Sequence, residues 1–229
     1  MSRKSTGPNK SNQIYCTVRD DIISGVYPGG AFITEGALCE QFSVSRTPVR
    51  EALIRLSQDR FVDLIPNKGA TVPHVTISDI VELYQLRAVN EGLSAALVAE
   101  KHSDELLQKL ESSVLREETL LAQEDVEPLT VSREDFAFHD LIIFSSGNRR
   151  LIEIMTLINN QMRRFARSAA DRHAVETTLP RSLDYHCRTL EAIRRRDSGT
   201  AQALISEHWQ VMLNGYVQRS LEGILPIQL

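Results

Sequence analysis

A single proline, Pro48, stands at the head of a run of helix-forming residues and constrains this chain more than any other feature. Proline lacks an N–H and fits an α-helix only in its first turn, so a helix should begin near Ser45, whose side chain is the expected cap. Val49 then faces inward, while Arg46 and Arg50 remain exposed on the first turns. The sequence therefore predicts a capped helix that presents cations at its N-terminal end.

Two further helices are expected before this one. Apolar residues recur every four positions from Ile14 to Val26, which predicts an amphipathic helix that ends near Ser24 and Gly25. Thr34 is placed to cap a second, shorter helix. With cations on the third helix, this order is typical of helix-turn-helix proteins. The first turns of their recognition helix enter the major groove, where guanidinium groups reach base edges and small hydroxyls reach phosphates.

Two β-prone runs, 61–65 and 70–72, follow the third helix and flank the turn 66–69. They predict a two-stranded wing with Lys68 at its tip, near a phosphate or the minor groove. Residues 1–75 contain nine basic and seven acidic side chains, a net charge of +2, and this leaves −6 for the rest of a chain whose net charge is −4. A mildly basic N-terminal part followed by an acidic remainder is compatible with nucleic-acid binding by the N-terminal part.

The string VSRTPVREAL at 44–53, followed by Arg-Leu and a Pro-Asn-Lys-Gly wing turn, resembles the signature of the GntR family of winged-helix regulators. The resemblance covers about residues 12–75. The DNA contacts that it implies are Ser45, Arg46, Thr47 and Arg50 on the recognition helix and Lys68 and Gly69 in the wing. Two positions depart from the family pattern. Gly36 stands where members often carry an arginine, and Arg60 stands where a glycine usually ends the helix.

From Ile77 onward the apolar period is helical almost throughout. Cap and loop signals predict about six helices with short connections, which form an antiparallel bundle. A length of 229 residues favours two modules with separate cores. We therefore predict a mainly α protein with a winged helix-turn-helix domain at 10–75 and an all-helical effector-binding and dimerisation domain at 76–225.

Four residues of this second domain predict a metal site. Asp135 and His139 are four residues apart on one predicted helix, so they share a face and can bind one ion. His186 and His208 lie on the last two long helices, which a bundle can bring opposite that face. One carboxylate and three imidazoles suit a divalent cation such as zinc, nickel, manganese or iron, and they leave one or two coordination positions open for an oxygen ligand.

The sequence around these residues, at 134–148, 185–197 and 207–208, resembles the FCD-type ligand-binding domain of FadR-like GntR regulators. In the metal-binding members of that group an aspartate and three histidines at matching places hold the ion, and all four positions are filled here. The resemblance therefore implies that this domain binds a metal ion and a small carboxylate effector.

Three more residues are candidates for contact with the effector. Arg87 matches a family position that can point toward the effector cavity, where its guanidinium group would pair with a carboxylate. An ion pair with Glu91, one helical turn further on, is the alternative. Asn159 and Arg163 share a helix face and could line the same cavity.

Together these features predict a transcriptional regulator, and a repressor in particular. We expect it to bind a near-palindromic operator as a homodimer, with an affinity that an organic acid modulates at the metal. The chain has no apolar run long enough to span a membrane and no secretory signal, so a cytoplasmic location is expected. Three cysteines without Cys-x-x-Cys spacing predict reduced thiols, to which we assign no role.

Two alternatives stay open at this point. Three histidines, a carboxylate and an open coordination position could instead activate water in a metal-dependent hydrolase, although the sequence offers no evident general base beside them. The ion could also be purely structural and fasten the helices together. The sequence does not specify the acid, the ion, the target genes, or whether the acid releases or strengthens DNA binding.

Overall fold

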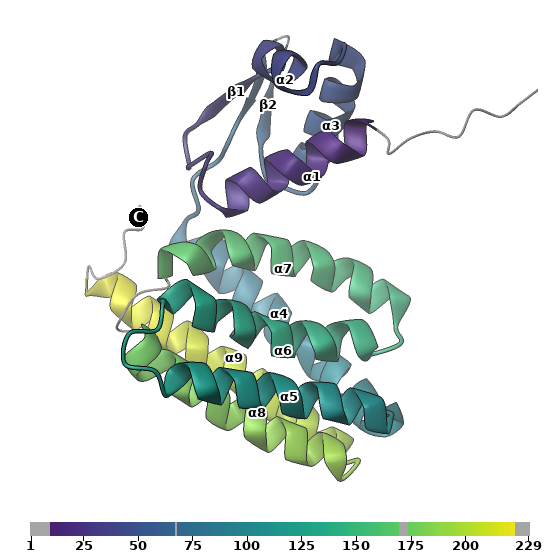
Figure 1. Cartoon of the computed structure of the whole chain (residues 1–229), viewed down its shortest axis with the longest axis vertical. Coiled ribbons are helices and arrows are strands. Elements are labelled where there is room, and N and C mark those ends of the chain that lie inside the picture. Colours follow the sequence, from purple (N-terminus) through teal and green to yellow (C-terminus); the bar gives the residue numbers. More distant parts are fainter. Residues whose placement is uncertain (1–9, 67, 170–173, 223–229) are drawn as a thin grey trace, which may run out of the picture. The chain divides into compact units, whose positions relative to one another are not determined.

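A computed structural model describes residues 10–66, 68–169 and 174–222 of the chain. Asn67 of the predicted wing turn and the end of the predicted second domain, 223–225, lie outside the described residues. The chain divides into two compact units, residues 1–75 and 76–229 (Figure 1). The predicted fold class is confirmed: both units are mainly helical, and the first contains a small antiparallel sheet.

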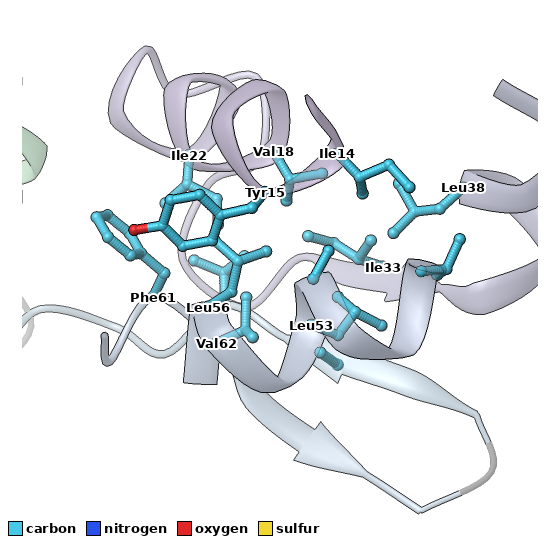
Figure 2. Close-up of a cluster of buried hydrophobic side chains, with 14 residues drawn as sticks. Ile14, Tyr15, Val18, Ile22, Ile33, Leu38, Leu53, Leu56, Phe61 and Val62 are labelled. Carbon is cyan, nitrogen blue, oxygen red and sulfur yellow. The ribbon is translucent and has the colours of Figure 1, made fainter. Parts of the chain in front are cut away.

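Three helices form most of the first unit: α1 (Lys10–Ile23), α2 (Glu35–Phe42) and α3 (Arg46–Gln58). Each contributes to one apolar core, in which Ile14, Leu38 and Leu53 represent the three helices (Figure 2). The Thr34 side chain caps α2 as predicted, since its Oγ1 accepts a hydrogen bond from the Ala37 N–H at 3.1 Å. This core places α3 with its apolar side inward and its polar side in solvent.

The two ends of α3 differ from the sequence-based expectation. Ser45 occupies the cap position, but its hydroxyl makes no capping hydrogen bond within the described chain, so the predicted side-chain cap is wrong. Pro48 fits the first turn, where an N–H would have no helical partner. At the other end Arg60 has a φ of 60°, in the left-handed region. Glycine adopts this conformation without steric cost, so Arg60 strains the backbone where the resemblance implied a glycine.

A three-stranded antiparallel sheet completes the first unit, formed by β1 (Phe32–Thr34), β2 (Asp63–Ile65) and β3 (Gly69–Thr71). The strand order is β1-β3-β2, so the predicted hairpin of β2 and β3 is present and β1 adds a strand that the sequence analysis missed. Gly69 has a φ of 144°, and a Cβ atom there would lie 2.0 Å from the Ile33 carbonyl oxygen. The approach of β1 to β3 therefore requires glycine at this position.

The described residues of the second unit form six α-helices, as predicted: α4 (Ile77–Lys101), α5 (Asp104–Leu121), α6 (Pro128–Ser145), α7 (Arg149–Ala169), α8 (Leu179–Arg194) and α9 (Ser198–Leu221). A short π-helical segment, η1 (Ala174–Thr178), precedes α8 directly and was not predicted. Thr76 and Asp79 form a capping box at the start of α4. None of the helices among the described residues is long and apolar enough to cross a membrane.

Helix α4 organises the bundle, because it packs along α9 and also contacts α6, α7 and α8. Gly92 allows the close approach of α9, since a Cβ atom there would lie 2.5 Å from the Ser206 Oγ. Helix α5 packs against α6 and α8 on another side of the bundle. The interior enclosed in this way contains several fully buried ionisable side chains among the apolar ones, and these form the candidate site.

Candidate metal centre

Three helices bring the three predicted histidine ligands together. His139 comes from α6, His186 from α8 and His208 from α9, and all three side chains are fully buried. One ring nitrogen of each lies within 4.8 Å of the others. The closest pair is Nε2 of His139 and Nε2 of His186, 3.0 Å apart.

Asp135 lies one turn before His139 on α6, as its spacing predicted, and is 8% exposed. Its Oδ1 atom is 3.8 Å from the Nε2 atom of His186 and accepts a hydrogen bond from the Ser182 hydroxyl. Burial raises the pKa of Asp135 to about 6, against the opposing effect of His186. The three imidazoles form one group of candidate ligands, and Asp135 forms a second with Glu117 and His186, so His186 joins the four sequence-predicted ligands.

The electronic state of the imidazoles fits a bound cation. Nδ1 of His139 faces Glu91 and Nδ1 of His186 faces Glu117. With both glutamates ionised, the imidazole protons lie on Nδ1 and the two Nε2 lone pairs oppose each other at 3.0 Å. A tetrahedral zinc ion with nitrogen ligands at roughly 2.0–2.1 Å would hold two such atoms about 3.3 Å apart. A divalent ion placed between them would therefore replace repulsion with two coordinate bonds.

His208 supports the same interpretation. Neither of its ring nitrogens has a hydrogen-bond partner within the described chain, although the side chain is fully buried. A buried polar group without a partner is costly. Coordination of a metal ion would give one of these nitrogens its partner. Burial lowers the pKa values of His139 and His208 well below the usual range, which keeps both rings neutral and able to coordinate.

Two buried glutamates belong to this cluster, and the sequence analysis did not assign them to it. Glu91 on α4 accepts the hydrogen bond from Nδ1 of His139, and Glu117 on α5 accepts one from Nδ1 of His186 at 2.8 Å. Burial raises the pKa of Glu117 to about 8 and also raises the pKa of Glu91. The sequence considered Glu91 only as a partner of Arg87, and it gave no signal for Glu117.

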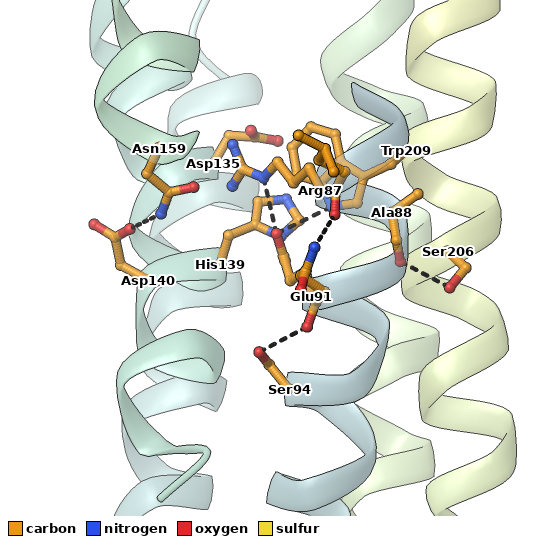
Figure 3. A network of polar contacts seen from close by, with 12 residues as sticks. Arg87, Ala88, Glu91, Ser94, Asp135, His139, Asp140, Asn159, Ser206 and Trp209 are labelled. Carbon is orange, nitrogen blue, oxygen red and sulfur yellow. Dashed lines mark hydrogen bonds and ion pairs between the residues drawn. The ribbon is translucent and has the colours of Figure 1, made fainter. Parts of the chain in front are cut away.

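Arg87 is fully buried and makes the ion pair that the sequence analysis left as an alternative (Figure 3). Its Nε donates to Glu91 Oε2 at 2.8 Å, and the guanidinium carbon lies 3.9 Å from the centroid of the Trp209 ring. The two terminal nitrogens, Nη1 and Nη2, have no hydrogen-bond partner within the described chain. They leave two donors available inside the bundle for an anionic group.

A cavity of about 90 Å³ reaches the metal cluster at Asp135 and His208. Its wall also includes Tyr84 on α4 and Met212 and Arg219 on α9, of which Arg219 is 7% exposed. No motif in the sequence marked Arg219, because its inward direction depends on how α9 packs. The cavity therefore offers a small molecule access to the cluster.

Arg87 is not among the described side chains that line this cavity, and neither are the other two residues predicted for effector contact, Asn159 and Arg163. Both lie on α7 and both engage Asp140 on α6: Nδ2 of Asn159 donates to Oδ1 at 2.9 Å, and Arg163 forms an ion pair with Oδ2. They share a helix face, as predicted, and that face joins α7 to α6.

In the first unit the residues predicted to contact DNA are mostly exposed: Ser45, Arg46, Thr47, Arg50 and Lys68. Arg50 forms an ion pair with Glu35, with Nε 2.8 Å from Oε1. Gly69 is buried in the sheet, where its lack of a side chain is required. Ser45, Arg46, Thr47 and Arg50 lie at the start of α3, and Lys68 lies in the turn directly before β3.

Each of the two units matches a known protein family. Residues 82–211 match the FCD domain, and residues 10–72 match the gntR family of bacterial regulatory proteins. The chain is 29% identical to the gluconate operon transcriptional repressor of Bacillus licheniformis, across 86% of this chain and 79% of that protein. It is 30% identical to the Nta operon transcriptional regulator of Aminobacter aminovorans, across 80% and 85%. The solved structure of E. coli McbR/YncC has the same fold, with a TM-score of 0.72 at 21% identity, across 93% of this chain and 100% of that one.

Proposed function

Because the chain belongs to the GntR family of bacterial regulatory proteins and contains an FCD domain, we propose that it is a metal-dependent, acid-responsive repressor of the FadR-like subgroup. The family and the named relatives are transcriptional regulators, so the protein is a regulator and not the hydrolase considered from sequence. The repressor activity is inferred from the gluconate operon repressor that it resembles.

The proposed DNA-binding surface is the N-terminal end of α3 together with the wing. Arg46 and Arg50 read base edges in the major groove, while Ser45 and Thr47 contact phosphates. The Arg50 side chain is 48% exposed, so its ion pair with Glu35 is weak in water and can be exchanged for a base contact. Lys68 reaches a phosphate or the minor groove, and Gly69 sets the shape of the wing.

The single observation that carries the sensing proposal is the convergence of three buried imidazoles and Asp135 in a cluster that opens to a cavity. These four side chains would hold a divalent ion, and zinc, nickel, manganese and iron all suit the ligand set. When bound, the ion supplies a coordination position for an oxygen atom of the effector. The residues around it position that oxygen and exclude water.

We propose a compact organic acid as the effector. The cavity of about 90 Å³ is smaller than the roughly 150 Å³ that accommodates benzene in an engineered protein cavity, so it favours a short carbon frame. Arg87 lies behind Trp209, which lines the cavity, and its two terminal nitrogens would reach a carboxylate in a fork geometry only after that wall shifts. Asn159 and Arg163 act through Asp140, by holding α7 against α6 at the side of the site.

A second copy of the chain is the proposed partner in DNA binding. Helix α4 exposes Leu86, Val89 and Leu93 on one face, and the neighbouring helix α7 exposes Ile154 and Leu157. Apolar side chains gathered on adjacent helices are typical of an interaction surface. A two-fold dimer through this face would present two recognition helices to a near-palindromic operator, and the bound acid would alter their spacing by favouring one arrangement of the bundle.

Operator binding measured by fluorescence anisotropy tests this proposal. The duplex comes from the region upstream of the gene, and the protein is used metal-loaded and chelator-treated, each with a series of short hydroxy acids and dicarboxylates. We expect at least one acid to change the operator affinity of the metal-loaded protein only. His208→Ala should abolish that response and leave basal DNA binding intact.

Two outcomes would contradict parts of the proposal. Equal affinity with and without every acid, in both metal states, would remove the sensing function and leave the DNA-binding function standing. A large fall in melting temperature on metal removal, combined with an unchanged response to the acid, would instead assign the ion a purely structural role.

A further inference from the structure

We propose that Glu91 and Glu117 are positioning residues of the metal centre, each holding one ligand imidazole through its Nδ1 atom so that Nε2 faces the ion. This inference rests on the proposed metal site and assigns a task to two residues outside the four ligands. The two glutamates come from α4 and α5, which supply none of the four sequence-predicted ligands, and Glu117 also lies within 4.8 Å of ligand atoms of Asp135 and His186.

The contacts are direct and fully buried. Nδ1 of His139 donates to Oε1 of Glu91, and Nδ1 of His186 donates to Oε2 of Glu117 at 2.8 Å, with all four side chains at 0% exposure. An imidazole whose Nδ1 proton is bound by a carboxylate keeps its lone pair on Nε2 and becomes a stronger ligand. In agreement with this, the two Nε2 atoms point toward one another and lie 3.0 Å apart.

The two glutamates are held to different degrees. Oε2 of Glu91 accepts hydrogen bonds from Arg87 Nε at 2.8 Å and from Trp209 Nε1 at 3.1 Å, so its other oxygen is directed at His139 (Figure 3). Oε1 of Glu117 has no hydrogen-bond partner within the described chain. Glu91 is therefore part of a wider hydrogen-bond network, whereas the hydrogen bond described for the Glu117 side chain is the one from His186. A substitution of Glu117 should consequently disturb fewer other contacts.

The charges of the buried groups distinguish a positioning role of the glutamates from a merely structural one. Asp135, Glu91 and Glu117 bring three carboxylates into the interior, and Arg87 is the guanidinium ion-paired within the cluster. Ionising all three carboxylates in a dry interior requires compensation. Arg87 balances one of the three negative charges, and a divalent cation would balance the other two. The glutamates should consequently stabilise the metal-loaded protein more than the metal-free protein.

Glu117→Gln tests this, because it keeps the size of the side chain and its acceptor oxygen while removing the charge. The full chain is titrated with Zn²⁺ in competition with a chromophoric chelator, and melting temperatures are measured with and without zinc. Replacing an outer carboxylate of this kind weakens metal binding by about 10-fold to 100-fold, and we expect a loss in that range with an unchanged metal-free melting temperature. Glu105→Gln, on the same helix and ion-paired with Lys109 at the surface, should bind zinc as the parent protein does.

Glu91→Gln provides the second arm. It should weaken zinc binding similarly and also lower the metal-free melting temperature, since Arg87 and Trp209 lose a charged acceptor. A third measurement needs no substitution. Long-range ¹H–¹⁵N spectra of the zinc-loaded protein should show His139 and His186 coordinated through Nε2 and protonated at Nδ1.

Equal zinc affinity in Glu117→Gln and the parent protein, or coordination of these two rings through Nδ1, would overturn the inference alone. A parent protein that binds no zinc, nickel, manganese or iron would overturn the metal centre of the proposed function as well. The two failures are therefore distinguishable.

Discussion

The two units of the chain place their candidate functional residues in opposite environments. In the first unit Arg46, Arg50 and Lys68 are exposed on a helix end and a hairpin tip, above a core that contains none of them. In the second unit the four candidate ligands are themselves part of the core, at 0–8% exposure. An exposed cation becomes desolvated only when DNA arrives, whereas a buried histidine needs a partner at all times.

This difference predicts which measurable property a substitution in each unit should change. Residues of the exposed surface should affect operator affinity with little effect on the free energy of unfolding. Residues of the buried cluster should affect metal affinity and, through the bound ion, the stability of the metal-loaded second unit. The experiments below test this contrast, beginning with the largest expected effect.

Metal removal should produce the largest difference between the two units. An ion that binds only the folded state stabilises it by about 4 kcal/mol when present at about 1,000 times its dissociation constant. We expect differential scanning calorimetry to show a chelator lowering the transition of the second unit and leaving that of the first unchanged. Asp135→Ala should make the protein insensitive to the chelator. An equal shift in both transitions would contradict separate cores.

Leu56→Ala should destabilise the first unit and leave the second unit unchanged, the reverse of metal removal. Leu56 is fully buried in the first unit, and truncation of such a residue costs about 3 kcal/mol through lost contacts and a cavity. We expect operator binding to fall as the first unit unfolds, while zinc affinity stays at the parental value. Ile54→Ala, on the same helix but 47% exposed, is the matched control and should change stability by no more than about 0.5 kcal/mol.

Arg46→Ala should weaken operator binding by about 1–3 kcal/mol if the guanidinium group reads a base. Because Arg46 is exposed, melting temperature and zinc affinity should remain unchanged. Anisotropy titrations with the operator and with single-base variants of it provide the measurement. Arg149→Ala, an exposed cation of the second unit, is the control. A large loss of stability in Arg46→Ala would show that this side chain supports the fold.

Lys68→Ala should have the smallest effect. A lysine that touches only a phosphate weakens binding to all duplexes alike and contributes about one unit to the slope of log affinity against log salt concentration. Titrations of the operator and an unrelated duplex at several salt concentrations should show that loss of slope. Lys109→Ala, in the second unit, should leave the slope as it is. Loss confined to the operator would instead assign Lys68 a base contact.

Local sequence rules predicted much of both sites. Pro48 located the start of α3, and the four-residue spacing of Asp135 and His139 placed both side chains on one face of α6. These features succeed because they depend on helix geometry alone. The convergence of His186 and His208 came from the resemblance to a family, since nothing in their spacing requires α8 and α9 to meet.

The residues that were missed depend on tertiary packing. Glu117 lies beside charged neighbours on an amphipathic helix, and it is buried because α5 packs against α8. Strand β1 has three residues immediately before a helix, which is too short for an alternating pattern to appear. Arg219 faces the cavity because of the way α9 packs along α4. Neither the charge pattern nor the periodicity of the sequence reports these arrangements.

The cavity wall at Asp135 and His208 has a kinetic consequence. These two residues are ligands in the proposed centre, so an acid that entered this cavity would lie beside the ion. An acid seated there would obstruct the exit of the metal and slow its exchange with chelators in solution. The rate at which the ion exchanges would then depend on whether the acid is bound.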